Sequence, residues 1–124
     1  EACEVGKTLG LSTSDQSEQG LASLGQGILK AVPVDSVVIH PTAFAVSVNH
    51  SGVRLVQGPF TARPLITTGA GDHFNAGFCM GRLLGLSNEE SLLCGVSTSG
   101  FYVRTAKSPT LSDLAGLMRN WPQS

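Results

Sequence analysis

Cysteine is scarce in this chain of 124 residues, and its few positions exclude two kinds of site. The three cysteines, Cys3, Cys79 and Cys94, form an odd set without metal-ligand spacing, so neither a disulfide framework nor a zinc site is expected. Cys79 and Cys94 fall on apolar faces of predicted helices. We therefore expect reduced thiols in the protein core.

Charge and long apolar runs are also limited. The net charge is −1, which gives no indication of a nucleic acid or polyanionic partner. No apolar run approaches the length that spans a membrane, and no signal-peptide pattern opens the chain. These absences favour a cytoplasmic protein that binds neither nucleic acid nor a membrane.

Two glycine motifs are incomplete. A dinucleotide-binding fingerprint needs a third glycine after Gly69 and Gly71, at the position that Phe74 occupies. The run Gly6-Lys7-Thr8 resembles the end of a P-loop, but Glu1 stands where that loop needs its first glycine. We interpret Lys7 as an exposed helix residue.

The pattern of apolar and turn residues predicts alternating helices and short strands. Apolar spacing predicts helices over 2–9 and 21–32, which end at Gly10 and Pro33. A β-branched run predicts a buried strand at 36–39, and the strands at 44–48 and 53–56 are joined by a hairpin turn. Three further helices are expected over 72–84, from Ser87 and from Thr110, the last two with capping boxes. This alternation indicates an α/β layer fold.

The run from Leu65 to Phe78 carries the strongest functional signal. Gly69 and Gly71 allow a tight turn and a close approach of bare backbone N–H groups to a ligand. The helix that follows adds the positive end of its dipole, which favours anions. Asp72 places a carboxylate beside that anion. An anion cradle with an adjacent base suits phosphoryl transfer to a hydroxyl.

This run closely resembles the C-terminal signature of the ribokinase-like (PfkB) carbohydrate kinases. The resemblance implies the C-terminal, nucleotide-binding portion of a three-layer α/β/α fold. Residues 1–124 would be one segment of that kinase domain, without the N-terminal half that holds most of the sugar contacts. We expect this segment alone to be inactive, and its uncovered apolar surface leaves a homodimer open.

The resemblance also assigns roles to individual residues. Asp72 would take the proton of the acceptor hydroxyl, although an aspartate that only caps the helix is the alternative. The backbone N–H groups of Gly69, Ala70 and Gly71 would form the anion hole, and Thr68 would join the nucleotide-binding residues. The implied cofactors are ATP and Mg²⁺, and the implied substrate is a sugar or sugar-like small molecule.

A glutamate near the start of the chain is the candidate metal-associated residue. Glu4 resembles the glutamate of the family's Asn-x-x-Glu motif, which helps to organise the magnesium–nucleotide complex, usually through water. Glu1 stands at the asparagine position. The alternative for Glu4 is a solvated side chain on a helix surface.

The sequence departs from the family at the nucleotide-binding end. His40 to Ala43 replaces a Gly-x-x-Gly turn, and His40 is either a ligand of phosphate or ribose or a surface group. Gly95 and Ser99 fall on the small-residue stretch that lines the adenine pocket, with close helix packing as an equal alternative. Ile66 replaces an aspartate of a monovalent-cation site, so activation by potassium is doubtful.

Two other residues of the signature have simpler interpretations. His73 is expected at the surface or facing the acceptor, and Phe74 in the core.

Two further functions stay open: a ribokinase-like sensor of nucleotide or sugar with weakened catalysis, and a non-enzymatic interaction module.

Overall fold

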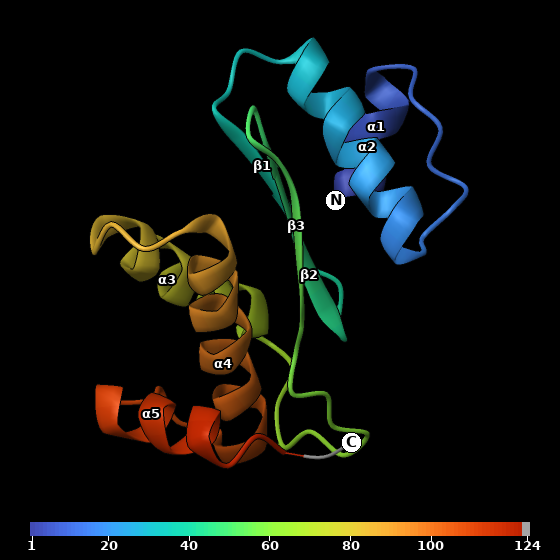
Figure 1. Ribbon diagram of the computed structural model, residues 1–124. Helices are drawn as coiled ribbons and strands as arrows, with labels where there is room; N and C mark the ends of the chain where they lie inside the picture. The colour runs from blue at the N-terminus through green and yellow to red at the C-terminus, as the bar shows by residue number, and fades with distance from the viewer. Residues whose placement is uncertain (123–124) are drawn as a thin grey trace.

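Residues 1–122 are described by a computed structural model (Figure 1), and they form five helices and three strands. The first two helices are α1 (Ala2–Thr8) and α2 (Glu18–Ala31). α1 is followed by Gly10 at a φ of 69°, a left-handed conformation that glycine often adopts after a helix. α2 begins earlier than predicted because the Ser17 side chain accepts a hydrogen bond from the Gly20 N–H group and caps the helix.

The strands β1 (Ser36–Ile39), β2 (Phe44–Asn49) and β3 (Gly52–Gln57) form an antiparallel sheet in the order β1-β2-β3. The predicted strands and the hairpin between β2 and β3 are confirmed. The prediction that β1 is a buried strand is wrong for most of its length. β1 lies at the edge of this sheet, and Ile39 is its one buried residue. A short β-branched run does not reveal which strand has neighbours on both sides.

Three helices follow the sheet: α3 (Ala70–Leu83), α4 (Asn88–Thr105) and α5 (Leu111–Arg119). The two capping boxes are confirmed. The side chains of Ser87 and Thr110 each accept a hydrogen bond from the backbone N–H group three residues later, and their own backbone N–H groups donate to the carboxylates of Glu90 and Asp113. α3 begins at Ala70 rather than at Asp72, because the preceding turn leads directly into the helix.

The elements form three layers. Figure 1 shows α1 and α2 on one face of the sheet and α3, α4 and α5 on the other. α2 contacts β1 and β2, whereas α4 contacts β2 and β3. Leu24 and Ile39 pack in a cluster on the α2 side, and Ala45, Phe74 and Leu92 pack in a cluster on the side of α3 and α4. The predicted α/β/α arrangement is confirmed.

The three cysteines are free thiols, and the prediction that Cys79 lies in the core is wrong. Cys94 is half-buried, but Cys79 is exposed. α3 turns Phe74, Gly77 and Gly81 into the interior, and Cys79 lies outside that stripe. Lys7 is exposed, as predicted. In the described part of the chain, no helix combines the length and hydropathy needed to cross a membrane.

Candidate active site

The turn before α3 has a defined geometry. The Ala70 N–H group donates to the Thr67 carbonyl at 3.1 Å, and Gly69 has φ 87° and ψ −1°. These angles are those of the third residue of a type II turn, which requires a positive φ. Glycine adopts this conformation without the steric cost that a side chain brings. The glycine at position 69 therefore allows the chain to enter α3 directly from the turn.

The free backbone N–H groups at this helix start differ in part from the predicted set. The Ala70 N–H group is already bonded to Thr67, so it does not point freely at a ligand, and its predicted place in the anion hole is corrected. Among residues 1–122, the N–H groups of Gly69, Gly71 and Asp72 have no hydrogen-bond partner. They lie at or just before the positive end of α3 and are suited to an anion.

Asp72 lies in the first turn of α3 and is exposed. The helix cap is Gly69, and no side chain provides a capping hydrogen bond, so the interpretation of Asp72 as a mere cap is wrong. Its carboxylate makes no hydrogen bond to any described residue. Asp72 and His73 line a cavity of about 400 Å³ between α3, α4 and α5. The carboxylate is thus free to accept a proton beside the helix terminus.

A second cleft, of about 330 Å³, opens on the other side of the same helix terminus. Its walls come from the segments after β1 and β3, the turn before α3, and the C-terminal half of α4. The residues that line it include His40, Phe60, Gly71, Ser99 and Gly100. The structure therefore brings two predicted nucleotide-binding residues, His40 and Ser99, to one cleft with the start of α3.

His40 is a packed residue rather than a surface group. Its imidazole stacks on the ring of Phe74, and its half-buried position lowers the pKa of His40 to about 4. Desolvation penalises the charged form, so the imidazole is neutral at pH 7. In the cleft it offers a hydrogen-bonding group without a charge.

Two predicted nucleotide-binding residues do not line this cleft. Gly95 faces the ring of Phe74, where an added Cβ would lie 2.7 Å from Cε2 of that ring. Close packing, not room for a base, explains the glycine. Thr68 is exposed, and its carbonyl accepts a hydrogen bond from the Tyr102 hydroxyl.

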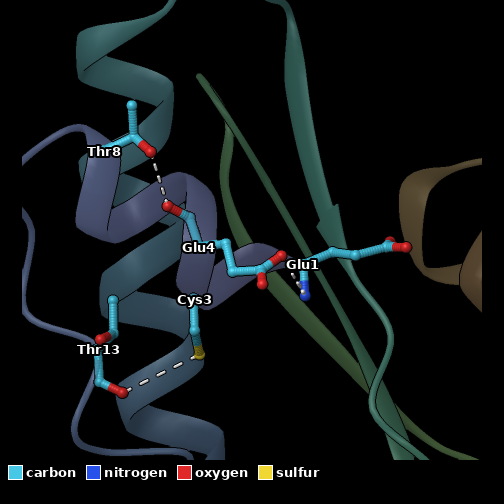
Figure 2. Close-up of polar contacts among 5 residues, drawn as sticks. All are labelled: Glu1, Cys3, Glu4, Thr8 and Thr13. Carbon is cyan, nitrogen blue, oxygen red and sulfur yellow. Dashed lines mark hydrogen bonds and ion pairs between the residues drawn. The ribbon is translucent and has the colours of Figure 1, made fainter.

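Glu4 lies on α1, which packs on α2 across the sheet from α3. Its Oε2 lies 3.9 Å from the backbone nitrogen of Glu1. Figure 2 shows these two groups side by side, with the Glu1 carboxylate pointing away from them. Glu1 shares a cavity with Gly71 and Phe74, and Glu4 does not line it. Within residues 1–122, no group of three or more His, Cys, Asp or Glu residues could hold a metal ion.

Sequence reasoning missed the residues that hold the site together. Arg104 donates from Nη1 to the carbonyls of Pro59 and Gly100 at 2.5 and 3.0 Å, and from Nη2 to the carbonyl of Phe60 at 2.6 Å. Burial lowers the pKa of this guanidinium. These bonds tie the segment after β3 to α4 and so fix one wall of the cleft. No motif in the chain marks Arg104, because its partners lie far away in sequence.

His73 and Tyr102 form a second unpredicted arrangement. Their rings stack with centroids 3.6 Å apart, and His73 also contacts the Gly69 carbonyl and the Ser108 hydroxyl. His73 is therefore half-buried and bonded on both ring nitrogens, so of its two expected positions the surface one is wrong. It lines the same cavity as Asp72, and its position facing the acceptor stays a prediction.

A family model of prokaryotic ketohexokinases matches residues 2–121. The chain belongs to this family. A ketohexokinase from Haloferax volcanii is 42% identical over 67 residues, which cover 54% of this chain and 18% of that protein. The predicted resemblance to carbohydrate kinases of the ribokinase type is confirmed.

Solved structures show the same fold at low identity. A mutant of phosphofructokinase-2 from Escherichia coli has a TM-score of 0.73 and 17% identity over 94% of this chain. A candidate ribokinase II from Escherichia coli, in complex with ATP and Mg²⁺, has a TM-score of 0.67 and 18% identity over 93% of this chain. A nucleoside kinase from Methanocaldococcus jannaschii has a TM-score of 0.67 and 18% identity over 83%. The ketohexokinase-family chain spans only 37–38% of the length of these structures.

Proposed function

We propose that this chain is the C-terminal, nucleotide-binding segment of a kinase that transfers the γ-phosphate of ATP to a hydroxyl of a sugar or sugar-like small molecule. The observation that carries the proposal is the start of α3, where unpartnered N–H groups and the unbonded carboxylate of Asp72 lie together. The names of the family and of its curated relative suggest a ketohexose as the first acceptor to test.

In this proposal Asp72 accepts the proton of the acceptor hydroxyl as its oxygen attacks the terminal phosphate. The N–H groups of Gly69 and Gly71 donate to the phosphate oxygens, on which negative charge is spread during the transfer. Because the protein forms no covalent bond in such a reaction, its contribution is to align the two substrates and stabilise that charge.

The nucleotide would lie in the cleft beside the start of α3. Ser99 and Gly100 give a wall of small residues, while Phe60 and Pro59 give an apolar wall that Arg104 holds in place. An apolar cleft with few polar groups suits a planar base. The phosphates would then extend toward Gly71.

Magnesium fits this chain only as a partner of the nucleotide. Mg²⁺ commonly keeps several waters and takes one or two carboxylates together with substrate phosphates, so a full protein cage is not needed. We propose Glu4 as a carboxylate that reaches it only through water, because Glu4 lies on α1 and does not line the cavity that Glu1 shares with Gly71. When bound, Mg²⁺ neutralises charge on the phosphates.

The test uses the complete kinase of which we propose this chain to be a segment, with MgATP and a ketohexose such as fructose. Asp72→Asn should lower turnover by about 10²–10⁴, because a positioned base is lost, and should leave ATP affinity unchanged. Asp35→Asn, an exposed acid next to β1, is the matched control and should keep full turnover. Turnover of Asp72→Asn within a few-fold of the unmodified protein would contradict the role of base. The 124-residue chain alone should bind MgATP without transferring phosphate.

A further inference from the structure

The turn before α3 is held from the side by one hydroxyl group. The Tyr102 hydroxyl, near the end of α4, donates to the Thr68 carbonyl at 3.1 Å. Thr68 and Gly69 share the central peptide of the type II turn. Among residues 1–122, no other group donates a hydrogen bond to the Thr68 carbonyl.

The orientation of that central peptide decides where the Gly69 N–H group points. Type I and type II turns differ by a flip of this peptide, and glycine at the third position tolerates both. In a trans peptide, the carbonyl and the following N–H group point in opposite directions. A hydrogen bond that holds the Thr68 carbonyl toward Tyr102 therefore directs the Gly69 N–H group away from Tyr102.

His73 supports the same turn from within α3. Its Nδ1 lies 2.8 Å from the Gly69 carbonyl, which can only accept, so Nδ1 carries a hydrogen. In the neutral ring Nε2 then has a lone pair, and the Ser108 hydroxyl, 2.9 Å away, donates to it. The imidazole is fixed at both nitrogens and lies 3.6 Å from the Tyr102 ring, 12° from parallel. This places the Tyr102 hydroxyl against the turn.

We propose that Tyr102 and His73 are positioning residues that hold the Thr68–Gly69 peptide in its type II orientation and so aim the Gly69 N–H group at phosphate. The inference rests on the proposed function for its ligand, and on the contacts above for its geometry. Tyr102 and His73 act through the backbone, since their own polar groups are bonded to the turn and to Ser108.

The experiment compares Tyr102→Phe with the unmodified 124-residue chain by NMR. The phenyl ring keeps the stack on His73 and loses only the donor. Residual dipolar couplings of the Gly69 N–H vector should change, because the peptide can now flip. Titration with inorganic phosphate and with MgATP should shift the Gly69 amide in the unmodified chain. In Tyr102→Phe we expect that response to be lost and the affinity to fall about 3- to 10-fold, the scale of one hydrogen bond.

Thr105→Val is the matched control, because Thr105 also donates a hydroxyl hydrogen bond to a carbonyl, that of Phe101, on the same helix. It should leave the Gly69 couplings and the affinity unchanged. Long-range ¹⁵N–¹H spectra should show the hydrogen of neutral His73 on Nδ1. Ser108→Ala should lower the population of that tautomer.

The outcomes separate the two proposals. Absence of phosphate and MgATP binding in the unmodified chain overturns the proposed function, and with it the aim of the N–H group at phosphate. Binding in the unmodified chain, together with unchanged Gly69 couplings and affinity in Tyr102→Phe, overturns the positioning role alone. Reorientation with weakened binding in Tyr102→Phe, but not in Thr105→Val, supports it.

Discussion

The imidazole of His40 stacks on the ring of Phe74, with the ring centroids 3.9 Å apart and the ring planes 8° from parallel. Phe74 is 2% exposed and belongs to the core between the sheet and α4. The stack therefore joins the segment after β1 to the first turn of α3. It also takes one face of the imidazole out of water, which lowers the pKa of His40 from 6.5 to about 4.

This stack predicts a loss of stability in mild acid. Between pH 6.5 and about 4 the unfolded chain binds a proton at His40 that the folded chain does not, so the free energy of unfolding falls as pH falls through this window. At pH 5 the full shift would correspond to about 2 kcal/mol, and the partial exposure of the ring reduces this to about 1 kcal/mol. Urea unfolding at pH 7.5 and at pH 5 measures this difference in the free energy of unfolding.

His40→Gln should remove that part of the pH dependence. His50→Gln, at the exposed hairpin turn, is the control and should keep it. The acids with lowered pKa values, Asp15, Glu90 and Asp113, lose their contribution to stability only below their ordinary pKa values of 3.8, 4.5 and 3.8, so they do not obscure the interval between pH 7.5 and pH 5. An equal pH dependence in His40→Gln and the unmodified chain would contradict the prediction.

Because Gly95 packs closely against the Phe74 ring, we predict that a larger residue at position 95 destabilises the core. In Gly95→Ala the new Cβ would lie 2.7 Å from Phe74 Cε2, closer than atoms can approach, so the core must shift. Overpacking of this kind typically costs about 1–3 kcal/mol. Gly116→Ala, at a helix position with open space around it, should instead stabilise the chain, by at most about 1 kcal/mol. Thermal unfolding of the two variants gives the comparison.

A nucleotide titration separates packing from binding at Gly95. We expect Gly95→Ala to bind MgATP as the unmodified chain does at temperatures where it is folded. Weaker binding in a fully folded Gly95→Ala variant would restore the sequence interpretation of Gly95 as part of the base pocket.

These cases show which parts of the fold the sequence could predict. The capping boxes at Ser87 and Thr110 were predicted correctly because each depends on residues three positions apart. The hairpin turn that ends at Gly52 and the turn at Gly69 likewise depend only on residues that are neighbours in the sequence. Such signals also placed the strands and helices well enough to indicate the α/β class.

The remainder depends on contacts between distant segments. Tyr102 reaches Thr68 across 34 positions, and Arg104 reaches Pro59 across 45. No periodicity in the chain reports such pairs. Gly95 illustrates the same limit, because a small residue on a helix suits a ligand pocket and a tight ring contact equally well.

The two glycines at the start of α3, Gly69 and Gly71, differ in a way that the sequence does not reveal. Gly69 has a φ of 87°, and a Cβ there would lie 3.3 Å from the Tyr102 oxygen. Gly69→Ala should therefore cost about 1–2 kcal/mol of stability through backbone strain. Gly71 lies inside the first turn of α3, and a Cβ there would meet no atom within 4 Å. The expectation that Gly71, like Gly69, is needed for the tight turn is therefore wrong.

Gly71→Val should consequently fold with a free energy of unfolding within about 1 kcal/mol of the unmodified chain, since valine is a tolerable helix residue. Its side chain would occupy open space at the cleft that Gly71 lines, where we place the phosphates. We expect phosphate and MgATP affinity to fall at least about tenfold, because the oxygens could no longer reach hydrogen-bond distance of the unpartnered N–H groups. Calorimetric titration and thermal unfolding of the same sample measure both quantities. Unchanged affinity in a folded Gly71→Val variant would mean that the turn only begins the helix.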